Sequence, residues 1–205
     1  MTSAAMRLGH LFIISGPSGA GKGTLVRELE KRVPDLWVSV SATTRTPRLG
    51  ERDGVDYYFL TPAEFEARVR AGEFLETASV HGNRYGTMRR PVERRLAHGM
   101  DALLEIDPQG AFQVRKQMGR SRLIFVKAPS TEELEKRIRH RGAESDDQIR
   151  TRLDTARHEL ELEGTYDHVV MNDDVPRAVD DLMAYIRSVS EQDAKDQVNT
   201  DGHSA

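Results

Sequence analysis

A cluster of glycines around one lysine is the first place where this sequence could carry out chemistry. Residues 16–24 read GPSGAGKGT, which gives a glycine, four residues, a second glycine and a lysine, the spacing of a phosphate-binding loop. Glycines let the backbone curl so that successive N–H groups point at phosphate oxygens, and the lysine adds a positive charge. The sequence therefore predicts a site for the phosphates of a nucleotide, formed by Gly16, Pro17, Ser18, Gly19, Ala20, Gly21, Lys22, Gly23 and Thr24.

One position of this loop departs from the usual pattern. Gly23 occupies the place of the usual serine or threonine, and Thr24 follows one residue later. The hydroxyl that often holds magnesium is therefore absent or displaced by one residue. Because Mg²⁺ gives up its waters reluctantly, we expect it to be bound mainly through nucleotide phosphates and waters, with no direct protein ligand. The glycines do not fit the G-x-G-x-x-G pattern of dinucleotide-binding folds.

Two arginines three residues apart form a second candidate anion site. Arg45 and Arg48 follow a short apolar segment and have serine and threonine hydroxyls around them. A guanidinium group offers forked donors that match phosphate oxygens, so the pair is suited to clamping a dianion. Residues 44–57 contain proline, two glycines and many charges, which predicts an exposed irregular connection. The alternative interpretation is a loop whose charged side chains are simply solvated.

Short apolar runs and amphipathic helices must position these two sites. The run at residues 11–14 stops at the glycine loop, as a buried strand would. Thr61, Pro62 and Glu64 form a helix start with a capping threonine. Alternation of strands and helices predicts an α/β fold with a parallel sheet. The predicted strands are 11–14, 37–40, 102–107, 122–126 and 168–171; the predicted helices are 24–33, 61–72, 131–141, 146–163 and a last one around 179–189.

The overall composition narrows the class of protein. The chain has 205 residues, 38% hydrophobic and 31% charged, which fits one polar but foldable globular domain. Thirty basic against 33 acidic residues give a net charge of −3, which argues against a nucleic-acid binder. The absence of cysteine excludes disulfides, a cysteine zinc site and a thiol nucleophile. The sequence has neither an apolar run of membrane-spanning length nor a signal-peptide core in residues 1–10, so we expect a cytoplasmic protein without a membrane partner.

Five separated blocks of sequence resemble those of the guanylate kinase family. They are residues 39–48, 50–57, 74–76, 82–87 and 105–110, and they keep the family's order and spacing within a resemblance from about Leu11 to Val189. Glu105 stands where many relatives have aspartate. The resemblance implies a P-loop NTPase-type core with a parallel sheet flanked by helices, a GMP-binding insertion and a small helical lid. The implied divisions are a tail at 1–9, one domain at 10–190 and a disordered tail at 191–205, with the core at 10–40 and 91–190, the GMP-binding arm at 41–90 and the lid at about 137–157.

The residue roles that this resemblance implies agree with the chemistry of guanine. The pairing edge of guanine presents an oxygen acceptor beside two nitrogen donors. A carboxylate accepts from those donors while a hydroxyl donates to the oxygen, and adenine presents the wrong polarity to each. The resemblance implies that Arg45, Arg48, Tyr57 and Tyr85 hold the GMP phosphate and that Ser41, Glu76, Thr87 and Asp107 read the guanine.

Three further arginines resemble those of the lid that folds over the triphosphate in this family. Arg137 and Arg141 lie four apart on a helix that a capping box at Ser130 opens, and Arg152 lies in the next helix. Two nucleotides bring roughly six negative charges together, so cations must converge on them. The alternative is a solvated basic face. The implied catalytic residues are Lys22, Arg45, Arg137, Arg141 and Arg152.

The resemblance also implies that Asn172, after the last predicted strand, lies near the base of the donor nucleotide. The alternative for Asn172 is a turn formed by the pair Asn-Asp. The implied activity is transfer of the γ-phosphoryl group of ATP to GMP with Mg²⁺, with dGMP as a further candidate acceptor and no nucleic-acid partner. Two other hypotheses stay open: a noncatalytic interaction module that keeps the fold, and a sister phosphotransferase that acts on AMP or another acceptor.

Overall fold

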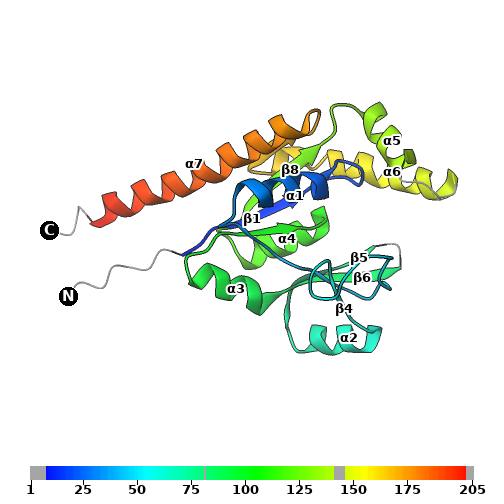
Figure 1. The fold of residues 1–205 in the computed structure, drawn as a ribbon, viewed down its shortest axis with the longest axis horizontal. Helices are drawn as coiled ribbons and strands as arrows, with labels where there is room; N and C mark the ends of the chain where they lie inside the picture. Colours follow the sequence, from blue (N-terminus) through cyan, green and yellow to red (C-terminus); the bar gives the residue numbers. More distant parts are fainter. Residues whose placement is uncertain (1–7, 81, 141–145, 202–205) are drawn as a thin grey trace.

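A five-stranded parallel sheet forms the centre of the protein (Figure 1). The structure, a computed structural model, describes residues 8–80, 82–140 and 146–201. The strand order β2-β7-β1-β8-β9 places the first strand in the middle, where it pairs in parallel with β7 and β8. The predicted parallel sheet is therefore confirmed. Its strands are β1 (Leu11–Ser15), β2 (Trp37–Val38), β7 (Ala102–Glu105), β8 (Arg122–Lys127) and β9 (His168–Met171).

Helices cover both faces of this sheet. Phe12 and Ile14 of β1 belong to one apolar cluster with α1 (Lys22–Arg32) and α7 (Val175–Asp201). Leu11 and Ile13 belong to another cluster with α3 (Arg89–Ala97) and α4 (Pro108–Gln117). Because successive side chains of a strand point to opposite faces, burial on both faces explains why residues 11–14 are all apolar. The glycine loop follows directly, at the carboxyl end of this buried strand.

A second, smaller sheet forms the arm expected at residues 41–90. Its strand order is β4-β3-β6-β5, with β3 (Ala42–Thr43), β4 (Tyr58–Phe59), β5 (Phe74–Val80) and β6 (Asn83–Met88). Helix α2 (Pro62–Arg70) packs on it through Phe65, whose ring stacks on Phe74 at 4.6 Å between centroids. The predicted capping box of α2 is confirmed, because Thr61 and Glu64 each accept a hydrogen bond from the other's backbone N–H.

The two helices of the lid region have a small apolar core of their own. Helix α5 (Thr131–His140) and helix α6 (Asp146–Leu160) contribute Leu134, Ile138, Ile149, Leu153 and Ala156 to this cluster. The helix expected over residues 146–163 ends at Leu160 and is followed by a short 3-10 turn, Glu163–Thr165. Apolar contacts thus hold α5 and α6 together as a unit, separate from the clusters on the main sheet.

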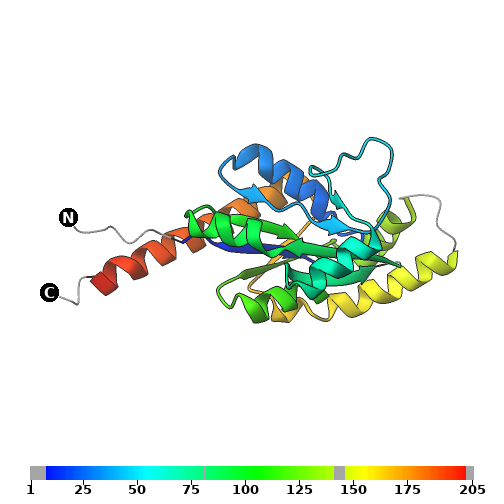
Figure 2. The same cartoon turned by 90° about the horizontal axis from the view of Figure 1, so that it is seen from below.

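The two chain ends differ from the expected tails. Helix α7 continues to Asp201 and extends beyond the sheet (Figure 2), so the expectation of disorder from residue 191 is wrong for residues 191–201. These residues include neither glycine nor proline, and a helix that is already nucleated extends at little cost. At the other end the Gly9 N–H donates to the Leu96 carbonyl at 2.9 Å, so the domain begins slightly earlier than residue 10. No helix in the described part of the chain is both long and apolar enough to cross a membrane.

Candidate active site

One cleft of about 690 Å³ brings the predicted donor and acceptor residues together. It lies at the carboxyl ends of β1 and β7, where ligands bind in open α/β sheets. Its walls come from the glycine loop, the arm, the turn between β7 and α4, and helix α6. The predicted residues that line it are Gly16, Ser18, Gly19, Gly21, Lys22, Gly23, Ser41, Arg45, Arg48, Tyr57, Glu76, Tyr85, Asp107 and Arg152. Others that line it were not predicted as site residues: Ser39, Glu105, Gln109, Thr151, Thr155 and Glu159.

The glycine loop has the strained backbone that its sequence predicts. Gly16, Gly19 and Gly21 have φ angles of 133°, 90° and 91°, which residues with a Cβ rarely adopt. Helix α1 begins at Lys22, so the positive end of its dipole faces the loop. The Lys22 Nζ donates to the carbonyls of Gly16 and Pro17, the second at 3.1 Å. These bonds hold the ammonium group over the loop, where a phosphate would lie.

Two neighbours restrict side chains in this loop. A Cβ on Gly19 would lie 2.9 Å from Ile138 Cγ1 of helix α5. A Cβ on Gly21 would lie 2.2 Å from Asn172 Nδ2, and that amide donates to the Ala20 carbonyl at 2.7 Å. Asn172 is only 3% exposed and does not line the cleft. The structure therefore places Asn172 behind the loop, where it fixes the backbone, and a position near the donor's base stays a prediction.

The contact between Gly21 and Asn172 leads to a prediction about donor binding. Gly21→Ala should raise the Kd for ATP at least about tenfold, because the left-handed backbone costs an alanine about 1–2 kcal/mol and the methyl group would displace Asn172. Titration of ATP by calorimetry measures this. The matched control is Gly119→Ala, since Gly119 has nothing within 4 Å of an added Cβ. Equal ATP affinity in the two variants would contradict the role assigned to this loop conformation.

A carboxylate lies opposite the position after the lysine. A Cβ on Gly23 would be 3.4 Å from both carboxylate oxygens of Glu105, at the end of β7. The Thr24 hydroxyl instead accepts a hydrogen bond from Arg27 at 3.4 Å and does not line the cleft. The Thr24 hydroxyl thus contacts Arg27 in this structure and not the cleft. Within residues 8–80, 82–140 and 146–201, no three or more histidine or acidic side chains converge as metal ligands would.

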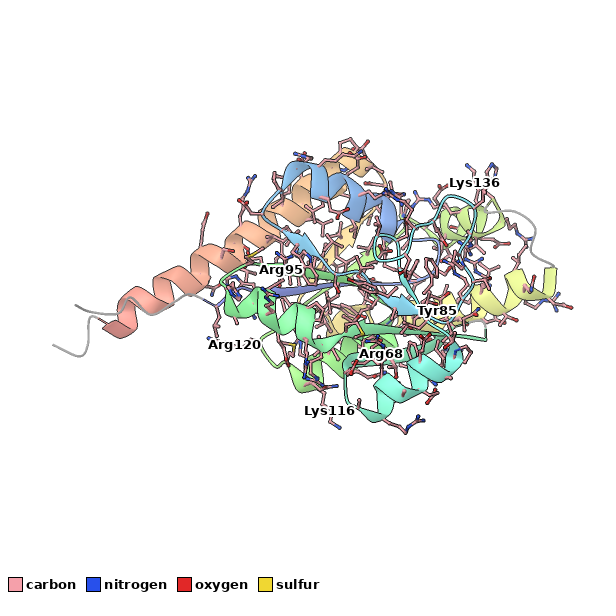
Figure 3. All side chains as sticks on the ribbon, turned by 60° about the horizontal axis from the view of Figure 1, so that its bottom comes forward. Arg68, Tyr85, Arg95, Lys116, Arg120 and Lys136 are labelled. Atoms are coloured by element: carbon pink, nitrogen blue, oxygen red, sulfur yellow. The ribbon has the colours of Figure 1, made fainter. Side chains whose placement is uncertain are left out.

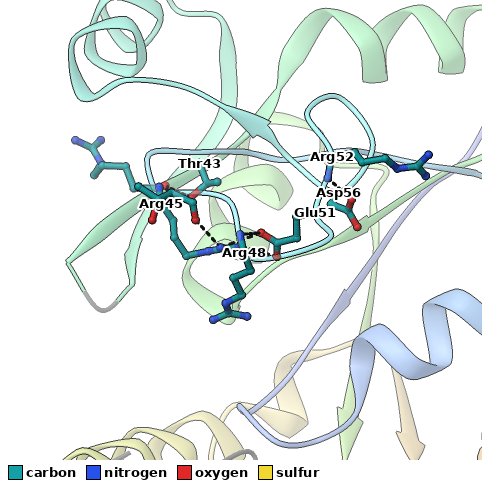
Figure 4. Close-up of polar contacts among 8 residues, drawn as sticks. Thr43, Arg45, Arg48, Glu51, Arg52 and Asp56 are labelled. Carbon is teal, nitrogen blue, oxygen red and sulfur yellow. Dashed lines mark hydrogen bonds and ion pairs between the residues drawn. The ribbon is translucent and has the colours of Figure 1, made fainter. Parts of the chain in front are cut away.

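The arm holds Arg45 in place with a carboxylate that the sequence analysis did not single out (Figure 4). Arg45 donates to both oxygens of Glu51, at 2.9 and 3.0 Å, and Glu51 accepts the Arg48 N–H at 2.7 Å. The hydrogen bond from Arg45 lowers the pKa of Glu51, and the same bond raises the pKa of Arg45. Glu51 thus orients the Arg45 guanidinium and folds the loop back on itself. The Arg48 side chain extends out of the loop (Figure 4) and lines the cleft.

Two tyrosines complete this anion site. The rings of Tyr57 and Tyr85 meet edge to face at 6.1 Å, and the Arg45 guanidinium lies 5.4 Å from the Tyr57 ring centre. Burial raises the pKa of Tyr57, and the charge of Glu105 raises it further. The phenol therefore stays protonated and can donate a hydrogen bond to an anion. The two arginines and the two tyrosines lie together along one wall of the cleft.

A buried carboxylate lies at the far end of the cleft. Glu76 of β5 is 5% exposed. The hydroxyl of Thr87, opposite it on β6, donates a hydrogen bond to Glu76 Oε1 at 2.8 Å. Burial raises the pKa of Glu76 to about 7, and the nearby charge of Asp107 contributes to the rise. Thr87 is fully buried and does not line the cleft. Its observed contact is therefore with the carboxylate, which it orients, and not with the space that a base would fill.

Asp107 reaches the same end of the cleft from the main domain. It caps helix α4, where its carboxylate accepts the Gly110 N–H at 2.7 Å. A Cβ on Gly110 would lie 2.7 Å from Glu76 Oε2, so glycine is needed there for Glu76 to approach the helix. Two carboxylates from different elements thus line one end of the cleft, where they could accept hydrogen bonds from a ligand with two donors.

The lid contributes one of its three predicted arginines directly. Arg152 of α6 donates to the Ser18 hydroxyl at 2.6 Å. Arg137 forms a hydrogen bond with Glu133 at 3.0 Å on its own helix and does not line the cleft, and Arg141 lies outside the described residues. Burial raises the pKa of Glu159, and the charge of Lys22 opposes the rise. The sequence signal for the polar residues of α6 is their spacing: Thr151, Thr155 and Glu159 recur every four residues, opposite the apolar stripe.

The fold and this cleft define a class of protein, the P-loop phosphotransferases of the α/β type with a second anion site facing the loop. The chain belongs to the guanylate kinase family, whose model matches residues 8–189. The predicted family, fold class and kinase activity are confirmed.

Individual relatives are similar over most of their length. The chain is 53% identical over 172 residues to "Guanylate kinase" of Parasynechococcus marenigrum strain WH8102, covering 84% of this chain and 94% of the relative. It is 51% identical over 183 residues to "Guanylate kinase" of Thermobifida fusca strain YX, covering 89% and 93%. A crystal structure of guanylate kinase from Anaplasma phagocytophilum has a TM-score of 0.73 and 33% identity, covering 89% of this chain and 86% of that one.

Proposed function

We propose that the cleft transfers the γ-phosphoryl group of ATP to GMP, giving ADP and GDP, with the glycine loop on the donor and the arm on the acceptor. The observation that supports this division is that both sets of residues line one cleft. ATP-dependent phosphorylation of GMP is the activity of the family to which the chain belongs.

On the donor side, backbone N–H groups of the loop and the start of α1 bind the phosphates. Lys22 lies over the loop through its bonds to Gly16 and Pro17, and Arg152 reaches the loop at Ser18. The two cations converge from α1 and from the lid, so that they neutralise charge on the migrating phosphoryl group. We also retain Arg137 and Arg141 as lid residues that approach the phosphates when the lid closes.

On the acceptor side, the cleft binds both ends of GMP, the phosphate and the base. Arg45, Arg48, Tyr57 and Tyr85 hold the phosphate, since Glu51 already orients the first of these groups. Glu76 and Asp107 accept hydrogen bonds from the nitrogen donors of guanine, and Ser41 donates to its oxygen. Adenine would offer these groups the wrong polarity and would leave the buried Glu76 carboxylate without a donor from the base, which is a strong basis for rejecting AMP.

No general base is required for this reaction. The second pKa of a phosphate monoester is near 6, so the attacking oxygen of GMP is already unprotonated at neutral pH. Catalysis then consists of bringing two anions together in line and neutralising their charge. Closure of the arm and the lid over the cleft excludes water, which would otherwise accept the phosphoryl group.

The residues near the loop fit a magnesium ion that the nucleotide brings with it. Glu105 presents a carboxylate opposite Gly23, whereas the Thr24 hydroxyl contacts Arg27. A carboxylate at this place can hold a metal-bound water, so we propose that Glu105 orients Mg²⁺ through water while phosphates and waters form the rest of the shell. When bound, the ion would supply positive charge that neutralises the phosphate oxygens. We further propose that the protein works in the cytoplasm, where ATP and GMP occur.

An acceptor panel tests the proposed function. With ATP, Mg²⁺ and a coupled assay for ADP, we expect GMP and dGMP to be phosphorylated, because both carry the base and the phosphate that the cleft recognises. AMP and UMP should be poorer by about 10⁴-fold in kcat/KM. Equal rates with AMP would instead indicate a sister phosphotransferase. Absence of turnover together with absence of ATP and GMP binding would indicate a noncatalytic interaction module.

A further inference from the structure

One edge of the arm sheet has side chains of the main domain in place of a neighbouring strand. Strand β5 is the last in the order β4-β3-β6-β5, so one side of its backbone has no partner strand within the part of the chain that the structure describes. Unpaired N–H and C=O groups at such an edge need other partners. Helix α4, which belongs to the main domain, packs against β5 and provides these partners.

Two glutamines of α4 form these bonds. Gln113 Oε1 accepts the Thr77 N–H at 3.2 Å, and Gln113 Nε2 donates to the Thr77 carbonyl at 3.0 Å. One side-chain amide thus satisfies both backbone groups of Thr77, as a neighbouring strand would. One turn further along, Gln117 Nε2 donates to the Leu75 carbonyl at 2.7 Å. We call Gln113 and Gln117 the glutamine clamp.

The glutamine clamp holds the backbone on both sides of Glu76. Leu75 and Thr77 flank this residue, whose own side chain points to Thr87 and to the first turn of α4. The same helix begins at its cap Asp107, and Gly110 leaves room for the Glu76 carboxylate. Helix α4 therefore fixes the position of one carboxylate through its cap and the position of the other through the clamp.

We propose that Gln113, assisted by Gln117, is a positioning residue for guanine recognition. The clamp holds the backbone of Glu76 against the helix that Asp107 caps, and so fixes the separation of the two carboxylates that would accept the nitrogen donors of guanine. This inference rests on the proposed roles of the two carboxylates. Inosine monophosphate lacks the 2-amino group of guanine, so it benefits less than GMP from a correct separation. Loss of the clamp should therefore reduce the preference for GMP over inosine monophosphate, which a general loss of stability would not do.

The test is Gln113→Met, which keeps an unbranched side chain of similar length and removes the amide. We expect the KM for GMP to rise about tenfold, as for the loss of two hydrogen bonds. The ratio of kcat/KM for GMP over inosine monophosphate should fall by a similar factor. The KM for ATP should be unchanged and kcat should change less than about twofold. Hydrogen exchange of the Thr77 amide should accelerate, because its acceptor is gone.

Two further variants complete the design. Lys116→Met changes an exposed residue of the same helix whose side chain points to solvent (Figure 3), and it should leave every readout at the wild-type value. Should Gln113→Met fail to fold, Gln117→Met removes one bond to the β5 backbone together with a hydrogen bond from Arg89, and it should give the same pattern at about threefold.

Two results would overturn the proposal. One is a folded Gln113→Met protein with faster Thr77 exchange but an unchanged preference for GMP, which would make the clamp structural only. The other is an equal loss for ATP and GMP. The wild-type protein and Glu76→Gln are measured in the same assay. If Glu76→Gln loses GMP activity and Gln113→Met does not, the proposed function stands and this inference fails.

Discussion

Lys22→Ala is expected to lower kcat for GMP phosphorylation by about 10²–10³-fold, the loss typical of removing one group that stabilises charge in a transition state. This loss should come from the site alone and not from the fold. Lys22 Nζ lies against the Gly16 and Pro17 carbonyls, so its removal takes a full charge from the loop without disturbing a core side chain. Turnover is measured by the coupled assay for ADP. A melting temperature close to that of the wild-type protein would show that the fold is retained.

Lys136→Ala provides the matched control for this prediction. Lys136 lies on lid helix α5 with 72% of its side chain exposed, and its ion pair with Glu133 has a separation of 3.8 Å. An exposed pair of this kind contributes little, so the control should retain wild-type kcat. Unchanged turnover in Lys22→Ala would place the donor phosphates elsewhere.

The KM for GMP is expected to rise as the pH falls below about 7, because guanine's donors need Glu76 as a carboxylate. Burial raises the pKa of Glu76 in the free protein to about 7. Below that pH the neutral acid predominates, and binding of GMP must release a proton. Each further pH unit should then weaken binding by about tenfold. The same raised pKa affects folding: because the folded protein holds this proton more tightly than the unfolded chain, the free energy of unfolding falls as the pH rises from about 5 to 7.

Glu76→Gln separates this effect from titration of GMP itself, whose phosphate gains a proton near pH 6. The variant should lower kcat/KM for GMP by about 10²–10⁴-fold, since hydrogen bonds to a charged group are lost. It should also abolish the change in KM between about pH 6.5 and 8. ATP affinity should be unaffected. An undiminished pH dependence in the variant would assign the titrating group to another residue.

Local spacing made some parts of this structure predictable. The glycine loop follows from the contiguous residues 16–24, and the strand before it from an apolar run that needs burial on both faces. The capping box of α2 is likewise complete within four residues. In each case the physical cause lies within one short stretch of chain, so the sequence alone indicates it.

Contacts between distant segments could not be read in this way. Strands β3 and β4 have two residues each, too few for an alternating pattern, and β5 and β6 contain polar residues where the cleft needs them. The contact of Asn172 with Ala20 spans 152 positions, and the pairing of Gln113 with Thr77 spans 36. No local propensity encodes either. Glu51 was within reach of a sequence argument, because it lies six residues from Arg45 in a block that the family resemblance already included.

The close approach of Gly19 to α5 has a consequence for how this protein could evolve. Ile138 and Leu134 would be 2.9 and 3.2 Å from a Cβ at this position, and both belong to the apolar cluster that joins α5 to α6. A side chain at position 19 would have to displace Ile138 and Leu134, which join α5 to the helix that carries Arg152. Descendants of this sequence can therefore exchange the surface of the lid freely, but its inner wall and the donor loop must change together.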